Sequence, residues 1–98
     1  MPASVYIVVR FRANAGQADD LRQTLGRLVA PTRQEPGCHQ YDLLQSPADP
    51  HDLCIVERWE DEASLTQHMA GEALRRTLGE ARAFMDGTPQ GGRFALVN

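Results

Sequence analysis

The chain contains no lysine, and its ten positive charges are all arginines, spread between positions 10 and 93. It has neither a run of basic residues nor the interleaving of arginines with aromatic residues that nucleic-acid-binding proteins use. The formal net charge is −3. The charge pattern therefore gives no reason to expect a nucleic acid as a partner.

Long apolar runs are also missing from the sequence. No stretch approaches the roughly 18 consecutive apolar residues that a membrane-spanning helix needs. The first residues, MPASVYIVVR, lack the succession of charged, apolar and small residues that marks a secretory signal. We therefore expect no membrane partner and a cytoplasmic location.

Cysteine and histidine are scarce. The two cysteines, Cys38 and Cys54, make neither a disulfide framework nor a zinc site, and we expect two reduced thiols. The three histidines, His39, His51 and His68, do not form a recognisable metal-binding set, and no ligand spacing such as HExxH occurs. Because no cofactor fingerprint is present either, we expect neither a metal nor a cofactor.

The length of 98 residues indicates one domain, residues 1–98, with a small hydrophobic core. Hydrophobic residues make up 42% of the chain and charged residues 23%, as in folded domains and unlike disordered chains. A core this small often needs support from a partner surface, so a homodimer is a reasonable expectation.

The hydrophobic period changes between the first two predicted elements. Residues 4–12 alternate between an apolar and a mixed face, which predicts a strand. Over residues 17–34 the apolar positions follow helical spacing, which predicts one helix. We expect this helix to bend at Pro31, whose ring would crowd a carbonyl of the preceding turn, and to end at Pro36 and Gly37.

The remaining pattern predicts two strands joined by a polar loop, then helices, then a last strand. In chain order these are a strand at 39–45, a loop at 46–52, a strand at 53–59, a helix from 61, a helical stretch at 74–85, a loop at 87–92 and a strand at 93–97. The order β-α-β-β-α-α-β predicts an α+β, ferredoxin-like fold, in which an antiparallel sheet carries helices on one face.

The two faces of the predicted sheet differ in what covers them. The face toward the helices includes Ile55, Glu57 and Trp59 of the third strand. The opposite face has no cover from its own chain, although it carries several apolar side chains: Tyr6, Val8, Arg10, Leu44, Cys54 and Val56. Because this face is too apolar for a fully wetted surface, we expect a homodimer through the sheet face.

Two segments resemble the antibiotic biosynthesis monooxygenase (ABM) family. They are RQEPGCHQY at residues 33–41 and ERWEDEASLTQH at residues 57–68, and their order and spacing extend the resemblance over nearly the whole chain. The resemblance implies a dimeric α/β-barrel, with a cavity in each subunit between the sheet and the helices. The proteins that the chain resembles include cofactor-free monooxygenases of quinols or hydroxy-aromatics, haem-degrading enzymes, isomerases for small hydroxyketones and proteins without known activity.

Two departures from the family pattern narrow these choices. Haem degraders of this shape use an Asn, a Trp and a His where this chain has Val9, His68 and Leu78, so haem chemistry is disfavoured. Many family members also carry a second histidine five positions after the first, where this chain has Ala73. This departure weakens any scheme that needs two imidazoles.

The candidate catalytic residues are His68 and Glu57. His68 matches the family motif, and neutral imidazole is a base near neutral pH; the alternative is a structural helix histidine. Leu65, a candidate substrate-binding residue, and Met69 are expected to flank it on the buried side. Glu57 lies on an apolar face and must be paired or have a raised pKa, and we favour a salt bridge to an arginine over catalysis.

Four further residues are candidate substrate-binding residues: Trp59, Tyr41, Ile55 and His39. Trp59 either packs in the core or holds a flat aromatic substrate. Tyr41 matches the family and is expected on the same strand face as His39. His39 would act as an acid or base only if that face lines the cavity, and we favour an exposed His39.

We hypothesise a cofactor-independent monooxygenase that oxidises a small phenolic or quinol-type aromatic with dioxygen. The deprotonated substrate would itself supply electrons to dioxygen, while the protein supplies a base, His68, an orienting group, Glu57, and a pocket shaped by Trp59 and Tyr41. One alternative is a non-redox isomerase or lyase of a small carbonyl compound that uses the same base. Another is a non-catalytic, small-ligand-binding dimer.

Overall fold

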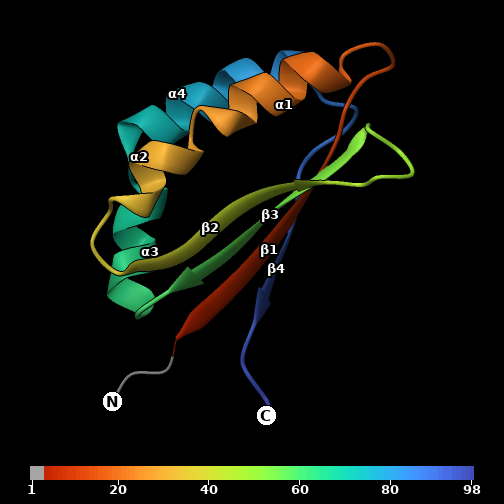
Figure 1. The fold of residues 1–98 in the computed structure, drawn as a ribbon. Coiled ribbons are helices and arrows are strands. Elements are labelled where there is room, and N and C mark those ends of the chain that lie inside the picture. Colours follow the sequence, from red (N-terminus) through yellow and green to blue (C-terminus); the bar gives the residue numbers. More distant parts are fainter. Residues whose placement is uncertain (1–3) are drawn as a thin grey trace.

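Four antiparallel strands form one sheet in the computed structural model, which describes residues 4–98 (Figure 1). The strands are β1 Val5–Arg12, β2 Cys38–Gln45, β3 Asp52–Trp59 and β4 Gln90–Phe94. Their order across the sheet is β2-β3-β1-β4, and every neighbouring pair is antiparallel. This topology confirms the predicted ferredoxin-like fold.

The helices lie on one face of the sheet, as predicted (Figure 1). They are α1 Ala18–Gly26, α2 Val29–Arg33, α3 Glu62–Met69, α4 Glu72–Ala81 and a short 3₁₀ helix, η1 Arg82–Phe84. Helices α1 and α4 pack against each other, and α2 packs against β2. Among residues 4–98, no helix has both the length and the apolar character needed to cross a membrane.

The single helix predicted over residues 17–34 is wrong, because the chain divides it into α1 and α2. At the junction, the N–H groups of Arg27 and Leu28 donate to carbonyls three residues back, at 3.3 and 3.0 Å, which tightens the end of α1. The helix then restarts, so that Pro31 falls in the first turn of α2. The missing N–H of proline leaves no helical hydrogen bond unmade at that position.

The last strand also differs from the prediction of residues 93–97. β4 begins at Gln90 and ends at Phe94, and it pairs with β1 along its whole length. Gly91 and Gly92, which were predicted to lie in a loop, are therefore strand residues. Hydrogen-bonded pairing with β1 overrides the low strand propensity of glycine here.

β3 lies between β2 and β1 and carries the centre of the core. Its helix-facing side chains, Leu53, Ile55, Glu57 and Trp59, are at most 5% exposed, as the alternating pattern predicted. The helices and the turn between α1 and α2 complete the core with apolar side chains: Leu21, Leu25, Leu28, Leu65, Leu74 and Ala81. On β1 the same face is less covered, because Ile7 and Val9 are only half-buried.

The start of β2 contains a β-bulge. The register against β3 shifts between Cys38 and Gln40, so His39 is an extra residue at the edge of the sheet. His39 is exposed, whereas Tyr41 is 2% exposed and faces the core. The favoured interpretation of an exposed His39 is therefore confirmed.

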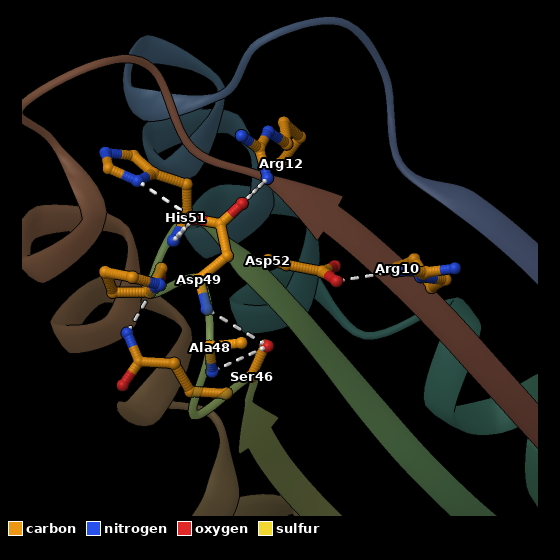
Figure 2. A network of polar contacts seen from close by, with 9 residues as sticks. Arg10, Arg12, Ser46, Ala48, Asp49, His51 and Asp52 are labelled. Carbon is orange, nitrogen blue, oxygen red and sulfur yellow. Dashed lines mark hydrogen bonds and ion pairs between the residues drawn. The ribbon is translucent and has the colours of Figure 1, made fainter.

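Polar contacts fasten the β2–β3 loop to the end of β1 (Figure 2). Arg12 forms an ion pair with Asp49, and Arg10 forms one with Asp52 at 2.9 Å. The Asp49 carboxylate also accepts the backbone N–H of His51 at 3.0 Å. The hydrogen bond from Arg12 is the main cause that lowers the pKa of Asp49 to about 2. His51 thus belongs to the contacts that shape this loop.

Candidate functional site

Glu57 and Trp59 are brought together by the two-residue repeat of β3. Both side chains point toward the helices, and Trp59 Nε1 donates a hydrogen bond to Glu57 Oε1 at 2.9 Å. Burial raises the pKa of the Glu57 carboxyl, although the Trp59 hydrogen bond and the nearby His68 act to lower it. The predicted salt bridge from Glu57 to an arginine is wrong, because its partners among residues 4–98 are Trp59 and His68.

His68 enters the core from α3, whose start is fixed by a side-chain cap. The Asp61 carboxylate accepts the backbone N–H and the hydroxyl of Ser64 at 2.9 and 2.8 Å, and these bonds lower the pKa of Asp61. Leu65 and His68 lie one turn apart on the inner side of the helix and are buried. Met69 is 57% exposed, so the prediction that it flanks His68 on the buried side is wrong.

Three aromatic rings converge in this part of the core. The imidazole of His68 stacks on the indole of Trp59, with centroids 4.6 Å apart and an angle of 30° between the planes. Tyr41 meets His68 edge-on at 5.6 Å and 68°. All three side chains are at most 2% exposed. The structure thus brings together Tyr41 of β2, Trp59 of β3 and His68 of α3.

His68 lies between two carboxylates. Its Nδ1 atom is 3.1 and 3.2 Å from the two carboxylate oxygens of Glu35, which are hydrogen-bond distances. Its Nε2 atom is 3.9 Å from Glu57 Oε1, which is too far for a hydrogen bond but close enough for attraction between charges when the imidazole is protonated. We call Glu35, Tyr41, Glu57, Trp59 and His68 the His68 cluster.

Glu35 is the member of the His68 cluster that sequence reasoning missed. It lies in the turn between α2 and β2, where its carbonyl accepts the N–H of Cys38 at 3.1 Å. Two positions later in this turn, Gly37 has a φ of +82° and its carbonyl accepts the N–H of Glu60 at 2.7 Å. The available signal was Glu35 itself, which lies in the segment at residues 33–41 that carries the resemblance to the ABM family.

Burial and the acidic neighbours raise the pKa values of two other groups of this region. Burial, followed by the charges of Glu57 and Glu35, raises the pKa of the Tyr41 phenol. The same three causes raise the pKa of the Cys38 thiol. Tyr41 is therefore a neutral hydroxyl in this setting, and Cys38 lacks the electropositive surroundings of a nucleophilic thiolate.

The remaining candidates do not add polar groups to the His68 cluster. Ile55 and Leu65 are core residues, 2% and 8% exposed, on the side of the sheet that faces the helices. His39 is exposed at the bulge of the edge strand and has no place in the cluster. Among residues 4–98, no group of three or more His, Cys, Asp or Glu side chains could hold a metal ion.

The cavity expected around these rings is not among the main hollows found over residues 4–98. Four of the main hollows have volumes of about 310–410 Å³, and none of these four is lined by Tyr41, Trp59 or His68. The largest of the four lies beside residues of β1 and β3 and the chain after β4, and its lining is Tyr6, Ile7, Val8, Val56, Glu57 and residues 94–98. The aromatic rings are thus packed against one another, and the largest of these hollows reaches the side chains around His68 only at Glu57.

Comparison with known proteins identifies the family. Residues 4–79 match the antibiotic biosynthesis monooxygenase family. The chain belongs to this family. The crystal structure of PA3566 from Pseudomonas aeruginosa is similar over 100% of this chain and 98% of that one, with a TM-score of 0.91 and 31% sequence identity.

Two further proteins show how far the similarity to this family extends. The Mycobacterium tuberculosis protein Rv0793, whose name gives monooxygenase as a provisional activity, is 35% identical over 68 residues. These residues are 69% of this chain and 66% of Rv0793, which is just under two thirds of that protein. SnoaB, a cofactor-independent oxygenase from Streptomyces nogalater, shares the fold at 20% identity, with a TM-score of 0.85 over 97% of this chain and 94% of SnoaB.

Proposed function

We propose that this ABM protein is a cofactor-independent monooxygenase that oxidises a small phenolic or quinol-type aromatic with dioxygen. The observation that supports this function best is the His68 cluster, in which a buried imidazole lies between two carboxylates and against an indole and a phenol. A base held among aromatic rings suits the deprotonation of an aromatic hydroxyl. The names of Rv0793 and SnoaB agree with this assignment.

The reaction balances without an external reductant. A quinol and one dioxygen molecule give a hydroxyquinone and one water molecule. One oxygen atom enters the product, the other leaves as water, and the substrate supplies all four electrons. The protein then has to remove the hydroxyl proton, orient the ring and exclude bulk water, because the electron-rich anion itself reacts with dioxygen.

Each residue of the proposed site has a separate role. His68 takes the substrate proton at Nε2, the nitrogen that faces Glu57 rather than Glu35. Glu57, held by the indole N–H of Trp59, orients the substrate hydroxyl. Trp59 and Tyr41 shape the aromatic surroundings. The imidazole of His68 is buried, so water does not screen its interactions and they stay strong.

The substrate reaches this site beside β1, on the helix-facing side of the sheet. Ile7 lies next to Glu57 in the strand register, and Val9 lies next to Ile55. Both β1 side chains are half-buried, whereas the neighbouring side chains of β3 are almost completely buried. A flat, apolar ring that covers Ile7 and Val9 would therefore present its hydroxyl to Glu57 and His68.

Oxygen uptake by metal-free and flavin-free protein with simple quinols tests this function. Uptake should exceed spontaneous oxidation, and His68→Ala should lower the rate by about 100-fold, the usual contribution of a general base. His39→Ala is the matched control, because this exposed histidine lies outside the His68 cluster and its loss should leave the rate unchanged. Uptake at the spontaneous rate, or equal rates for the wild type and His68→Ala, would reject the assignment.

The close packing of the three rings favours one second candidate, a non-catalytic dimer that binds a small ligand. This candidate predicts that a quinol binds, as measured by calorimetry, but is not consumed with or without dioxygen. An isomerase or lyase that uses the same base would instead turn over a carbonyl compound without dioxygen. Anaerobic and aerobic assays with the same protein preparation therefore separate the three candidate functions.

We also propose that the ABM protein forms a homodimer through the outer face of its sheet. Apolar side chains remain open to solvent on or beside this face, with Leu44 49%, Phe94 57% and Leu96 64% exposed. Two of the four hollows lie along the same face. A second copy placed sheet against sheet would cover both features.

A further inference from the structure

Glu35 has contacts in the His68 cluster that the proposed function does not yet use. Both of its carboxylate oxygens lie within hydrogen-bond distance of His68 Nδ1, whereas Glu57 lies 3.9 Å from Nε2. A neutral imidazole carries one proton, so the two carboxylates compete for the nitrogen that bears it. Since Glu35 is the nearer acceptor, it favours the tautomer that carries the proton on Nδ1.

The position of Glu35 is built into the fold. Its turn is tied to the end of β3 by the hydrogen bond from the Glu60 N–H to the Gly37 carbonyl. Gly37 also packs directly against Ser64 of α3, where there is no room for a Cβ atom. The same helix carries His68 one turn later. Glu35 and His68 are 33 positions apart in the chain, yet one packed junction sets their distance.

Exposure separates the two carboxylates that flank the imidazole. The side chain of Glu35 is 37% exposed, whereas that of Glu57 is 7% exposed and that of His68 is 2% exposed. Water can therefore solvate the outer side of the Glu35 carboxylate while its inner side accepts the imidazole N–H. Contact with water therefore stabilises a charge on the Glu35 carboxylate, whereas the buried carboxylate of Glu57 lacks this solvation.

We propose that Glu35 is a positioning residue, which holds the proton of neutral His68 on Nδ1 and leaves the lone pair of Nε2 free on the Glu57 side. This inference rests on the proposed function, because Nε2 is the atom that acts there as the base. When Nε2 takes the proton of the substrate hydroxyl, the imidazolium formed is stabilised by Glu35. The proton then leaves on the oxygen atom that is released as water, and neutral His68 is restored.

The tautomer of His68 can be measured without any substrate. The ¹⁵N resonances of the imidazole distinguish a protonated from an unprotonated nitrogen at a pH where the ring is neutral. The wild type should carry the proton on Nδ1, and Glu35→Gln should move it toward Nε2, because Glu57 is then the only carboxylate acceptor near the ring. Glu60→Gln is the matched control, since it removes a charge nearby and should leave the tautomer unchanged.

Two spectroscopic results would overturn the inference. One is a wild-type His68 with the proton on Nε2, and the other is the same tautomer in the wild type and in Glu35→Gln. Because Glu35 is half-exposed, Glu35→Gln should fold like the wild type. The unfolding midpoint of each protein verifies that the folds are comparable.

An activity measurement separates this inference from the proposed function. With a quinol that the wild type oxidises, Glu35→Gln should lower kcat by roughly tenfold or more and leave KM unchanged, because the variant loses the orientation of the base and not a substrate contact. An unchanged kcat overturns the role of Glu35 in orienting the base. Absence of uptake by the wild type overturns the proposed function, while the NMR result still decides whether Glu35 sets the tautomer.

Discussion

At the scale of single residues, Glu57 has the environment that least favours its charged form. It is 5% exposed, it has no arginine partner among residues 4–98, and its hydrogen bond from Trp59 does not offset burial, so the pKa of its carboxyl remains raised. A raised pKa means that the folded chain binds the carboxyl proton more tightly than the unfolded chain does. The folded chain therefore loses stability, relative to the unfolded chain, once the pH exceeds the ordinary pKa of a glutamate.

The pH dependence of Glu57→Gln tests this interpretation. Below the ordinary pKa of a glutamate, Glu57 is protonated in both states and burial of its charge has no effect on stability. As the pH rises through the ordinary value and then the raised folded value, the wild type loses stability, whereas the glutamine variant does not. We expect Glu57→Gln to be the more stable protein near neutral pH, with a difference that disappears in acid.

Urea unfolding of both proteins over a range of pH measures this difference directly. Other acids, such as Asp49 and Asp61, have lowered pKa values and give the opposite slope, but they act equally in both proteins and cancel in the difference. Glu60→Gln, an exposed control, should show no such pH-dependent gain. A glutamine variant that is less stable than the wild type by the same amount at every pH would contradict the interpretation.

Alternation along β3 was sufficient to predict that Glu57 and Trp59 share the inner face, because a strand has a strict period of two. The polar partners of these residues were not predictable in the same way. The contact between Glu35 and His68 joins a turn to a helix 33 positions later, and it exists only once both have packed. Similarly, the bulge at His39 is an irregularity of pairing that no local pattern announces.

At the scale of elements, the turn between α2 and β2 is the junction that sets the geometry of the His68 cluster. Gly37 adopts a positive φ, and a Cβ at this position would lie 2.6 Å from the Cβ of Ser64. The residue is therefore glycine for two independent reasons, backbone conformation and space. Gly16 has a similar φ of +75°, but a Cβ atom there would have no neighbour within 4 Å, so Gly16 shares only the first reason.

Comparison of Gly37→Ala with Gly16→Ala separates these two effects. Gly16→Ala should lower the free energy of unfolding by about 1 kcal/mol, the loss expected for an alanine in the left-handed region. Gly37→Ala should lower it by roughly 1–3 kcal/mol more, because the methyl group must also displace Ser64 and the start of α3. Equilibrium denaturation measures both values, and equal losses would show that the contact with Ser64 relaxes freely.

The boundaries of elements were predicted less well than their order, and the two errors have physical causes. The helical period continues through residues 17–34, so it does not reveal the tightened turn at Arg27 and Leu28 that places Pro31 in the first turn of a new helix. Glycines at 91 and 92 suggested a loop, but the edge of β1 supplies hydrogen bonds that make them a strand. Tertiary pairing decides such cases, and composition cannot show it.

At the scale of the whole molecule, the sheet has one face covered by helices and one face that its own chain leaves open. This asymmetry was predictable, because it follows from the order of the elements and from the alternation within each strand. The open face is apolar in its middle, where Val8 and Val56 lie opposite each other in the register of β1 and β3. A second copy would cover these valines, and it would also cover the hollow that they share with Tyr6 and the chain after β4.

Val56→Glu tests the homodimer, because it places a charge at the centre of the proposed interface. In a dimer this charge would be buried without a partner and should shift the equilibrium to monomers by several kcal/mol, whereas in a monomer the half-buried position tolerates it. Met69→Glu is the matched control, an equal change at an exposed residue on the helix side. Sedimentation velocity should show dimers for the wild type and for Met69→Glu, and monomers for Val56→Glu. A wild type that sediments as a monomer at micromolar concentration would refute the dimer, and the apolar outer face would then need a different partner.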